Sequence, residues 1–436
     1  MDSAGSRVGA LAVLVLLAGA PPAVAQTIAP GERLSIRRCV DIALATHPDL
    51  QVFRSAVDIA AARVGEAKAG YYPSIDLSAG YRKDHAVDIN HRNPIGLPYS
   101  TIGDGNDTSA SITLQQTLYD FGKTGGSVRV EELSLDASRL DYDSVANSIV
   151  FRARVAYYDV LRALSVRDAN ADSVRAYEKH LQQARDFFEA GTKPRYDVTK
   201  AELDLSNEEL KLIESENRVK LAWVALNNAM GIGSSAEYTL DDGLDFAKYD
   251  VTLDAAMQYA FKHRPDLLGL LARQKAAEAS VSLAKTGFYP AFSALGSYRF
   301  DGRELPLDSG WSLGVTMSVN LFSGFATSRR VDQAIAVLST ERARTESLRL
   351  EIQREIEQAF LNLQLAEEAI ANAEVQVRLA TENLELANRR YEAGVGSPVE
   401  INDAIASMSR ANVVRVSALH GYKVVRAEIE KAMAKR

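Results

Sequence analysis

The chain consists of two copies of one unit, and this duplication restricts its fold more than any other feature of the sequence. His47–Leu50 aligns with Arg264–Leu267 at an offset of 217 positions (265 − 48). After one deletion the offset is 203 (391 − 188), and Phe188–Gly191 aligns with Tyr391–Gly394. Internal repeats indicate units that pack against each other rather than independent domains. The length alone would suggest roughly two or three domains, but the repeat predicts one duplicated structure.

The duplication divides the chain into two repeats joined by a linker. The first repeat is expected over 26–231, an acidic linker over 232–250, and the second repeat over 251–436. Each repeat begins with a short amphipathic helix, followed by a Pro-Asp-Leu segment and a second helix. Two strands and a very long helix complete the pattern in both copies.

The first 25 residues have the organisation of a secretory signal peptide. Arg7 precedes an apolar run over Ala10–Ala20, and the small residues that follow predict cleavage after Ala25. No later apolar stretch reaches the roughly 18 residues that a membrane-spanning helix needs. Cys39 lies well beyond the predicted cleavage site, so it is not the lipid-modified cysteine of a lipoprotein. The sequence therefore predicts an exported protein without a transmembrane helix or a lipid anchor.

Two segments are long enough to form helices of unusual length. Residues 127–190 and 325–393 contain neither glycine nor proline. At about 1.5 Å per residue, each predicts a helix of roughly 100 Å. Turns that contain glycine and proline follow, and returning helices are expected over Arg195–Met230 and Val399–His420. Helices of this length are typical of a coiled-coil or tunnel-like protein.

Four segments alternate between apolar and polar residues and predict strands. They lie at about 73–83, 108–119, 290–301 and 310–322. In the last of them, one side carries only apolar residues, namely Trp311, Leu313, Val315, Met317, Val319 and Leu321. A soluble sandwich would alternate in the same way. The strand lengths and the small, uncharged polar side instead favour a membrane barrel with a water-filled lumen.

Four strands cannot close a barrel around a pore, and an open sheet edge cannot face lipid. The chain is therefore expected to contribute its strands to a shared barrel in the membrane lipid. Three copies would supply twelve strands, and a cyclic homotrimer is the simplest arrangement that closes.

The composition excludes several classes of function. A formal net charge of −7 provides no basic surface for nucleic acid. The chain has one cysteine and six histidines, and it contains no phosphate loop, no nucleophile elbow and no His-Glu-x-x-His motif. The sequence therefore predicts a protein that is not an enzyme and that has no metal site and no other cofactor.

Taken together, these motifs resemble the outer-membrane efflux (TolC) family. The resemblance covers nearly all of residues 34–430. It rests on the two Pro-Asp-Leu segments and on three further features, which are the match of Tyr71–Pro73 with Phe288–Pro290, the match of Leu118–Gly122 with Leu321–Phe325, and the turn that Tyr391–Gly394 heads. It implies a mainly α-helical homotrimer whose twelve-stranded barrel crosses the outer membrane of a Gram-negative-type bacterium. A periplasmic α-helical tunnel would continue the barrel, and the linker would form a small equatorial domain.

The resemblance also implies a passive exit duct of a tripartite efflux or type I secretion system. Such a duct works with a periplasmic adaptor protein and an inner-membrane transporter, and the upstream pump largely determines the substrate. The alternative is a periplasmic coiled-coil structural or adaptor protein with a small β domain. An adaptor would usually contain one helical hairpin, whereas here both hairpins are joined to a strand pair. This difference favours the duct.

The family places a gate at the periplasmic tip of the tunnel. The resemblance assigns it to Asp197, Tyr391, Glu400 and Asp403, and assigns the adaptor contact to the turns at Gly191, Thr192, Lys193, Gly394, Val395 and Gly396. Glu400 and Asp403 share a helix face. In a trimer they would form two acidic rings that favour cations and repel each other. The alternative is a solvated helix start that the helix dipole favours.

The tip departs from the family pattern at Gly396, where family members can carry an arginine that ties the tip shut. Without that cation, the closed state is expected to depend more on a hydrogen bond between Tyr391 and Asp197. Lys193 and Arg195 are the other cations of the turns that could take its place.

Overall fold

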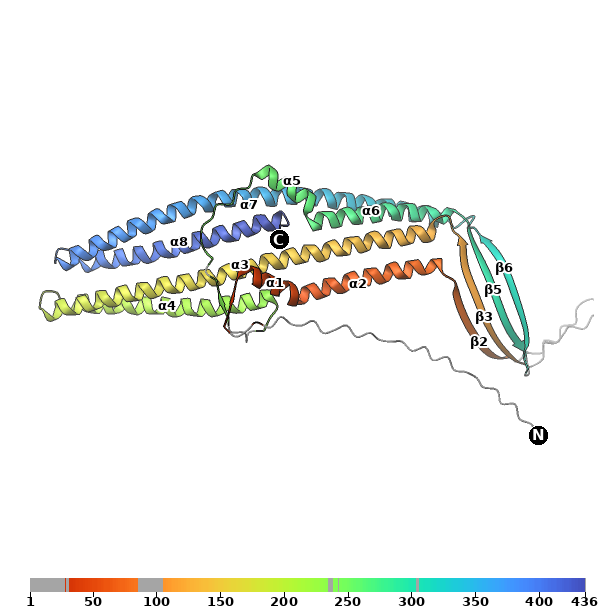
Figure 1. Ribbon diagram of the computed structural model, residues 1–436, viewed down its shortest axis with the longest axis horizontal. Coiled ribbons are helices and arrows are strands. Elements are labelled where there is room, and N and C mark those ends of the chain that lie inside the picture. Colours follow the sequence, from red (N-terminus) through yellow and green to blue (C-terminus); the bar gives the residue numbers. More distant parts are fainter. Residues whose placement is uncertain are drawn as a thin grey trace, which may run out of the picture.

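The computed structural model describes residues 28, 31–84, 105–233, 238–241, 243–302 and 306–435. Their helices form a long rod, and a four-stranded sheet stands at one end of it, at an angle to the helices (Figure 1). The signal peptide expected at 1–25 and most of the segment between the first two expected strands lie outside the described residues.

The two halves of the described chain contain the same succession of elements. The first half contains β1 (Glu32–Leu34), α1 (Ile36–Thr46), α2 (Pro48–Lys68), a 3-10 helix (Ala69–Tyr71), β2 (Ser74–Asp84), β3 (Gly105–Tyr119), α3 (Lys123–Glu189) and α4 (Arg195–Met230). The second half contains β4 (Tyr238–Leu240), α5 (Leu253–His263), α6 (Pro265–Lys285), a 3-10 helix (Thr286–Phe288), β5 (Ala291–Gly302), β6 (Asp308–Ser318), α7 (Ala326–Glu392) and α8 (Pro398–Ala432). The duplication in the sequence therefore corresponds to a duplicated structure.

The Pro-Asp-Leu segment begins a helix in each copy. His47 caps α2, because its Nδ1 accepts a hydrogen bond from the backbone N–H of Asp49 at 3.1 Å. The proline that follows occupies the first helical position, where a missing backbone donor costs nothing. In the second copy Arg264 forms ion pairs with Asp266 and Glu355, each at 2.6 Å. The same backbone start is thus held by a side-chain cap in one copy and by a mostly buried guanidinium in the other.

The longest helices follow from the segments that lack glycine and proline. α3 and α7 each contain 67 residues, or roughly 100 Å at about 1.5 Å per residue. α8 continues past the expected end at His420 to Ala432. Gly421 weakens the helix by roughly 1 kcal/mol, but Tyr422 and Ile429 beyond it are buried. Tertiary packing therefore extends α8 past a residue that disfavours helix.

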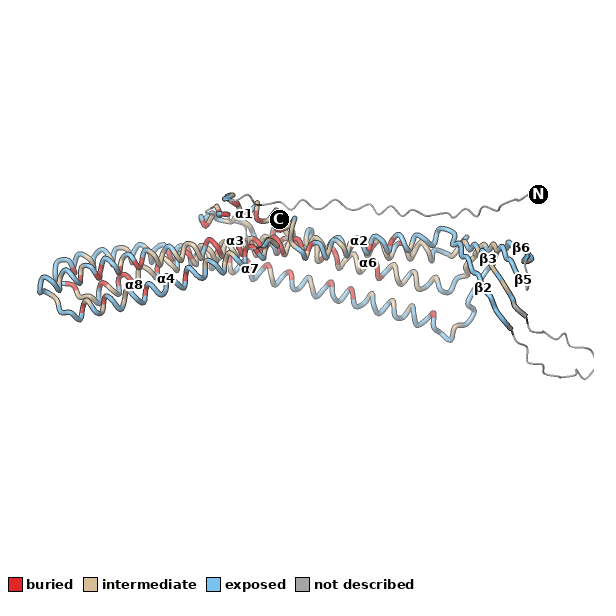
Figure 2. The backbone as a smooth tube through the Cα atoms, turned by 90° about the horizontal axis from the view of Figure 1, so that it is seen from below, coloured by how far each residue is buried: buried red, intermediate tan, exposed pale blue. Residues whose placement is uncertain are grey.

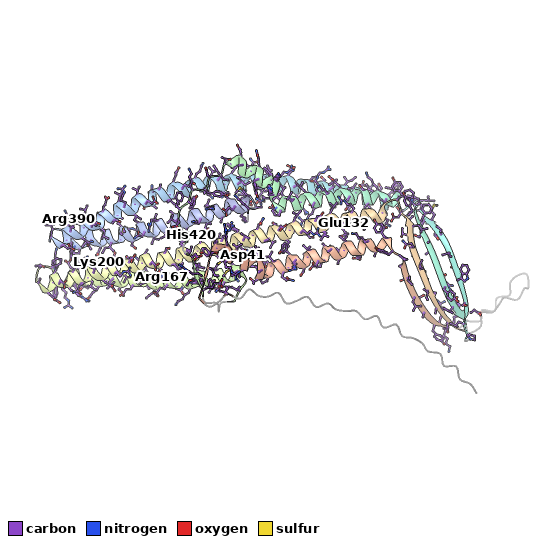
Figure 3. The ribbon with its side chains drawn as sticks, in the orientation of Figure 1. Asp41, Glu132, Arg167, Lys200, Arg390 and His420 are labelled. Carbon is purple, nitrogen blue, oxygen red and sulfur yellow. The ribbon has the colours of Figure 1, made fainter. Side chains whose placement is uncertain are left out.

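The long helix α3 contacts other helices along both halves of the rod. α3 lies beside α4 and α8 in one half of the rod and beside α2 and α6 in the other half (Figure 1). α8 is joined to α3 through Nε2 of His420, which lies 2.8 Å from Oδ1 of Asp159 (Figure 3). In the described part of the chain, no helix combines the length and the apolar character needed to cross a membrane.

Shorter helices meet end to end along the rod. The end of α4 meets the start of α2, where Oγ1 of Thr46 donates a hydrogen bond to the carbonyl oxygen of Met230 at 2.6 Å. Gly231 follows with a φ of +69°, and a Cβ atom there would lie 2.8 Å from Cα of His47. Only glycine fits this close approach without a shift of the backbone.

The sheet joins the strand pairs of the two repeats. Its strands are antiparallel in the order β2-β3-β5-β6, so β2 and β6 are its edges. The register places Ile75 opposite Leu114, and Leu77 opposite Ile112. β6 ends at Ser318, so the last part of the segment expected to be a strand lies after it.

The two faces of the sheet differ in character. One face carries large apolar side chains that are exposed in the single chain, including Ile75, Leu77, Ile112, Leu114, Tyr298, Trp311, Leu313, Val315 and Met317. In Figure 2 the edge strand β2 is coloured as exposed. The other face is mainly polar and combines serines and threonines with charged residues such as Arg82 and Arg299. Hydroxyl groups pair there across strands at 2.8 Å, in the pairs Ser78–Ser111 and Ser297–Ser312. An uncovered apolar face of this kind marks an interaction surface.

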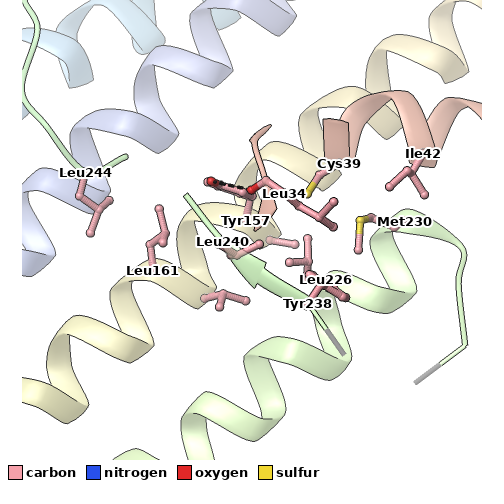
Figure 4. Close-up of a cluster of buried hydrophobic side chains, with 12 residues drawn as sticks. Leu34, Cys39, Ile42, Tyr157, Leu161, Leu226, Met230, Tyr238, Leu240 and Leu244 are labelled. Carbon is pink, nitrogen blue, oxygen red and sulfur yellow. Dashed lines mark hydrogen bonds between the residues drawn. The ribbon is translucent and has the colours of Figure 1, made fainter. Parts of the chain in front are cut away.

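The linker contributes to a compact core at the middle of the rod. Within the linker, β4 pairs in parallel with β1. Buried side chains from α1, α3, α4 and the linker pack around this pair (Figure 4). The Tyr157 hydroxyl donates a hydrogen bond to the carbonyl oxygen of Asp241 at 2.7 Å. Cys39 lies in this core, where burial and the charge of Asp241 raise the pKa of its thiol to about 12. Cys39 is therefore a protonated packing residue.

Candidate functional site

Both helical hairpins turn at the end of the rod that lies opposite the sheet (Figure 1). The first turn joins α3 to α4 over 190–194, and the second joins α7 to α8 over 393–397. We call this end the tip. Gly191 and Gly394 have φ angles of +72° and +76° and end α3 and α7 in the same way. The structure thus brings the residues that the family resemblance selected in the two repeats to one end of the molecule.

The second turn explains why glycine stands at position 396. The Gly396 N–H donates a hydrogen bond to the carbonyl oxygen of Arg390 at 2.9 Å. A Cβ atom at 396 would lie 2.8 Å from the backbone nitrogen of Tyr391, closer than side-chain atoms are found. A larger residue, arginine included, would force this turn to rearrange.

A different cation closes the second hairpin. Nε of Arg390, near the end of α7, lies 3.2 Å from Oε2 of Glu400 in the first turn of α8 (Figure 3). Lys193 instead lies with Nζ 5.7 Å from the centre of the Tyr391 ring. The sequence suggested Lys193 or Arg195 as the cation that replaces the missing arginine, but the residue that pairs with a gate carboxylate is Arg390.

Tyr391 is the centre of the contact between the hairpins. Its side chain is fully buried, at 0% exposure, although Phe188 at the equivalent position of the first repeat is 43% exposed. The Tyr391 ring meets His180 and Phe187 of α3 edge to face, with 5.3 Å between ring centres in both pairs. Ile401 of α8 belongs to the same buried cluster. The two repeats therefore use one aligned position in opposite ways.

The expected hydrogen bond between Tyr391 and Asp197 is not formed within one chain. The Tyr391 hydroxyl is buried and has no hydrogen-bond partner among the described residues. Burial and the negative charge of Asp197 raise the pKa of this hydroxyl. Asp197 is itself buried in the first turn of α4, where the helix dipole stabilises a carboxylate. Within the chain, the charge of Asp197 helps to keep the Tyr391 hydroxyl protonated, and the ring supplies the packing.

Polar side chains also connect the two hairpins. Nδ2 of Asn402 in α8 donates a hydrogen bond to Oδ2 of Asp204 in α4 at 2.6 Å. Asp204 also pairs with Lys200 one turn away. The Tyr177 hydroxyl donates to the Asn402 carbonyl oxygen at 3.5 Å. Sequence motifs did not mark these residues, and the only sequence signal was that several polar and aromatic side chains lie within a few helical turns of the glycines.

The two predicted ring carboxylates have different surroundings. Both Glu400 and Asp403 are exposed. The Glu400 N–H is capped by the Ser397 hydroxyl at 3.2 Å, and its carboxylate pairs with Arg390. Asp403 forms no ion pair within the described parts of the chain. The pair thus consists of one neutralised carboxylate and one unpaired carboxylate.

Comparison with known proteins identifies the family. The model of the outer membrane efflux protein family matches residues 39–232 and 256–434, which include both repeats and the tip. The chain belongs to the outer membrane efflux protein family. This membership confirms the resemblance that the sequence motifs indicated. As an outer membrane efflux protein, the chain is an outer-membrane exit duct that extends into the periplasm.

Individual relatives are distant but cover most of the chain. Protein CyaE of Bordetella pertussis is 26% identical over 385 residues, which cover 85% of this chain and 78% of that protein. The alkaline protease secretion protein AprF of Pseudomonas aeruginosa is 27% identical over 255 residues, which cover 55% of this chain and 50% of AprF. The structure of the Campylobacter jejuni CmeC outer membrane channel matches with a TM-score of 0.81 at 19% identity, covering 92% of this chain and 85% of CmeC. This match shows that this outer membrane efflux protein has the same fold as CmeC.

Proposed function

We propose that three copies of this outer membrane efflux protein assemble into a passive duct. The observation that carries the proposal is the sheet, which has two open edges, β2 and β6, and a bare apolar face. Pairing β6 of one copy with β2 of the next would remove both edges and give a twelve-stranded barrel. The apolar face would then meet lipid, and the small polar side chains would line the lumen.

The helical rods of the three copies would continue this barrel as a tunnel through the periplasm. The tip then lies farthest from the outer membrane, where a periplasmic adaptor and an inner-membrane transporter can reach it. The exposed residues of the turns, Gly191, Thr192, Gly394 and Val395, are suited to that contact. The relative AprF is an alkaline protease secretion protein, whereas the family is named for efflux. Both routes use the same kind of duct.

We assign the gate of this duct to the contact between the hairpins at the tip. Opening requires that the α7–α8 hairpin move relative to the α3–α4 hairpin, which exposes the buried Tyr391 ring. The ion pair between Glu400 and Arg390 restrains the same region, and the charge of Asp197 helps to keep Tyr391 neutral. The protein performs no catalysis in this role and needs no cofactor, because the pore only has to open and close.

Fractionation and bilayer recording test the duct. The protein should remain in the outer-membrane pellet after a salt wash, migrate as a trimer on unheated gels, and form channels in planar bilayers. The alternative, a periplasmic coiled-coil adaptor, predicts a protein that the salt wash releases and that does not conduct. Recovery of monomeric, salt-extractable protein would contradict the duct.

The two tip carboxylates should differ in their effect on ion selectivity. Asp403→Asn should lower the preference for cations, because the ring of Asp403 carries unpaired charge. The double change Arg390→Gln and Glu400→Gln should lower it less, because the ion pair that it removes carries no net charge. The reversal potential in a salt gradient measures both effects. A larger shift in the Arg390→Gln, Glu400→Gln double variant than in Asp403→Asn would contradict this assignment.

A further inference from the structure

A histidine that no sequence motif marks lies buried beside the tip. His180 of α3 is 2% exposed. Neither of its ring nitrogens has a hydrogen-bond partner among the described residues. A neutral imidazole has one N–H donor and one acceptor nitrogen, and leaving a buried polar group unpaired costs about 1–3 kcal/mol. Such groups are rare in native structures and call for an explanation.

The side chains around His180 come from both hairpins. Tyr391 of α7 meets the imidazole edge to face at 5.3 Å, and its own hydroxyl is also unpaired. α4 contributes the charges of Asp197 and Asp204. Asp204 is already bound by Lys200 and by Asn402. Since His180 and Phe187 of α3 both pack on Tyr391 of α7, separation of the hairpins would expose the imidazole to water.

The other nearby elements contribute little charge to the imidazole. α8 supplies apolar side chains to the cluster around Tyr391, and its Asp403 acts on Tyr177 of α3 rather than on His180. Lys193 of the first turn faces the Tyr391 ring. No described residue donates a hydrogen bond to the imidazole or accepts one from it.

The charge state of the imidazole follows from this environment. Burial lowers the pKa of His180, and the smaller attraction of Asp204 and Asp197 opposes that effect without reversing it. The ring is therefore neutral in the closed tip at neutral pH. In an open tip the ring is hydrated, and its pKa returns to about 6.5.

We propose that His180 is a proton-responsive latch, which holds the tip closed when it is neutral and promotes separation of the hairpins when it is protonated. This inference rests on the proposed gate and adds a signal to which the gate responds. An acidic periplasm would then make the duct easier to open for the same adaptor and transporter.

The direction of the pH dependence follows from linkage between proton binding and opening. The closed state has the lower pKa, so protons bind the open state more tightly. The latch is fully effective above pH 6.5 or so and weakens as the pH falls below it. At pH 5.5, one pH unit below the ordinary histidine pKa of about 6.5, the ratio of open to closed states rises by up to about tenfold per protomer.

The test is the pH dependence of opening in planar bilayers, recorded with the full-length trimer between pH 7.5 and 5.5. Wild-type channels should open more often as the pH falls. His180→Phe keeps a ring of similar shape against Tyr391 but cannot titrate, so its opening should be independent of pH over this range. His180→Gln provides a second variant that cannot titrate, in case the phenylalanine does not pack. His263→Phe is the matched control, because His263 is exposed on α5, away from the tip.

The outcomes separate the latch from the duct itself. Channels that conduct but show no pH response in the wild type would overturn the latch and leave the duct intact, whereas a protein that does not conduct at any pH would contradict the duct. An unchanged pH response in both His180 variants would also overturn the latch. A direct measurement uses the histidine NMR signals of the wild-type trimer, in which the His180 resonance should titrate below pH 6.5. Titration at or above the ordinary value of about 6.5 would contradict the proposal.

Discussion

Tyr391→Ala should open the duct in the absence of any partner, whereas Tyr391→Phe should leave it closed. The ring is fully buried between the hairpins and packs on His180 and Phe187. Truncating a buried aromatic side chain costs about 3–5 kcal/mol. If most of that loss falls on the closed state, the ratio of open to closed states rises by more than about a hundredfold, since each 1.4 kcal/mol is a factor of about ten. Removing only the hydroxyl loses no hydrogen bond within the chain, because the hydroxyl has no partner among the described residues.

Single-channel conductance in planar bilayers measures this effect. Phe188→Ala is the matched control, because Phe188 is the aligned aromatic residue of the first repeat and is largely exposed. It should conduct like the wild type. Retention of the trimer on unheated gels shows that each variant has assembled. If assembled Tyr391→Ala conducts like the wild type, or if Tyr391→Phe opens equally, the ring is not what holds the tip closed.

The sequence predicted the plan of the molecule because that plan depends on patterns that local chemistry determines. The absence of glycine and proline over 127–190 predicts α3, since those two residues are the ones that interrupt helices. Alternation in the strand segments predicts which side chains share a face. The repeat then predicts that the hairpins of the two copies end at the same place, because equal helices run from equivalent starting points.

The details of the tip depend on geometry that a single sequence does not carry. A missing arginine at 396 suggested a closed state that depends more on Tyr391 and Asp197, yet the backbone there approaches Tyr391 so closely that only glycine fits. The compensating Arg390 lies on the preceding helix. A tyrosine and an aspartate suggested a hydrogen bond, but in one chain the ring packs and the hydroxyl stays unpaired. Such outcomes are decided by the exact backbone geometry of the turn and by how the side chains of the two hairpins pack, and neither follows from residue type alone.

The alternation of apolar and polar residues along the strands also predicts how the sheet faces lipid and lumen after assembly. Leu313 and Ser312 are neighbours near the middle of β6, so their side chains point to opposite faces. Leu313 is 77% exposed in the single chain. Ser312 pairs with Ser297 on the polar face. If the apolar face meets lipid and the polar face lines the lumen, a lysine at Leu313 and a lysine at the adjacent Ser312 should have very different consequences.

Leu313→Lys should prevent stable insertion into the outer membrane, whereas Ser312→Lys should insert normally. A lysine on the lipid-facing side of a barrel costs about 2–4 kcal/mol near the middle of the bilayer, and a threefold assembly would incur that cost in every copy. A lysine in the lumen stays in water and adds a ring of positive charge, so it should shift the reversal potential toward anions. Heat-modifiable trimer in the outer-membrane fraction measures insertion for both variants. If Ser312→Lys is lost from the membrane while Leu313→Lys accumulates there, the two faces of the sheet have been assigned the wrong way round.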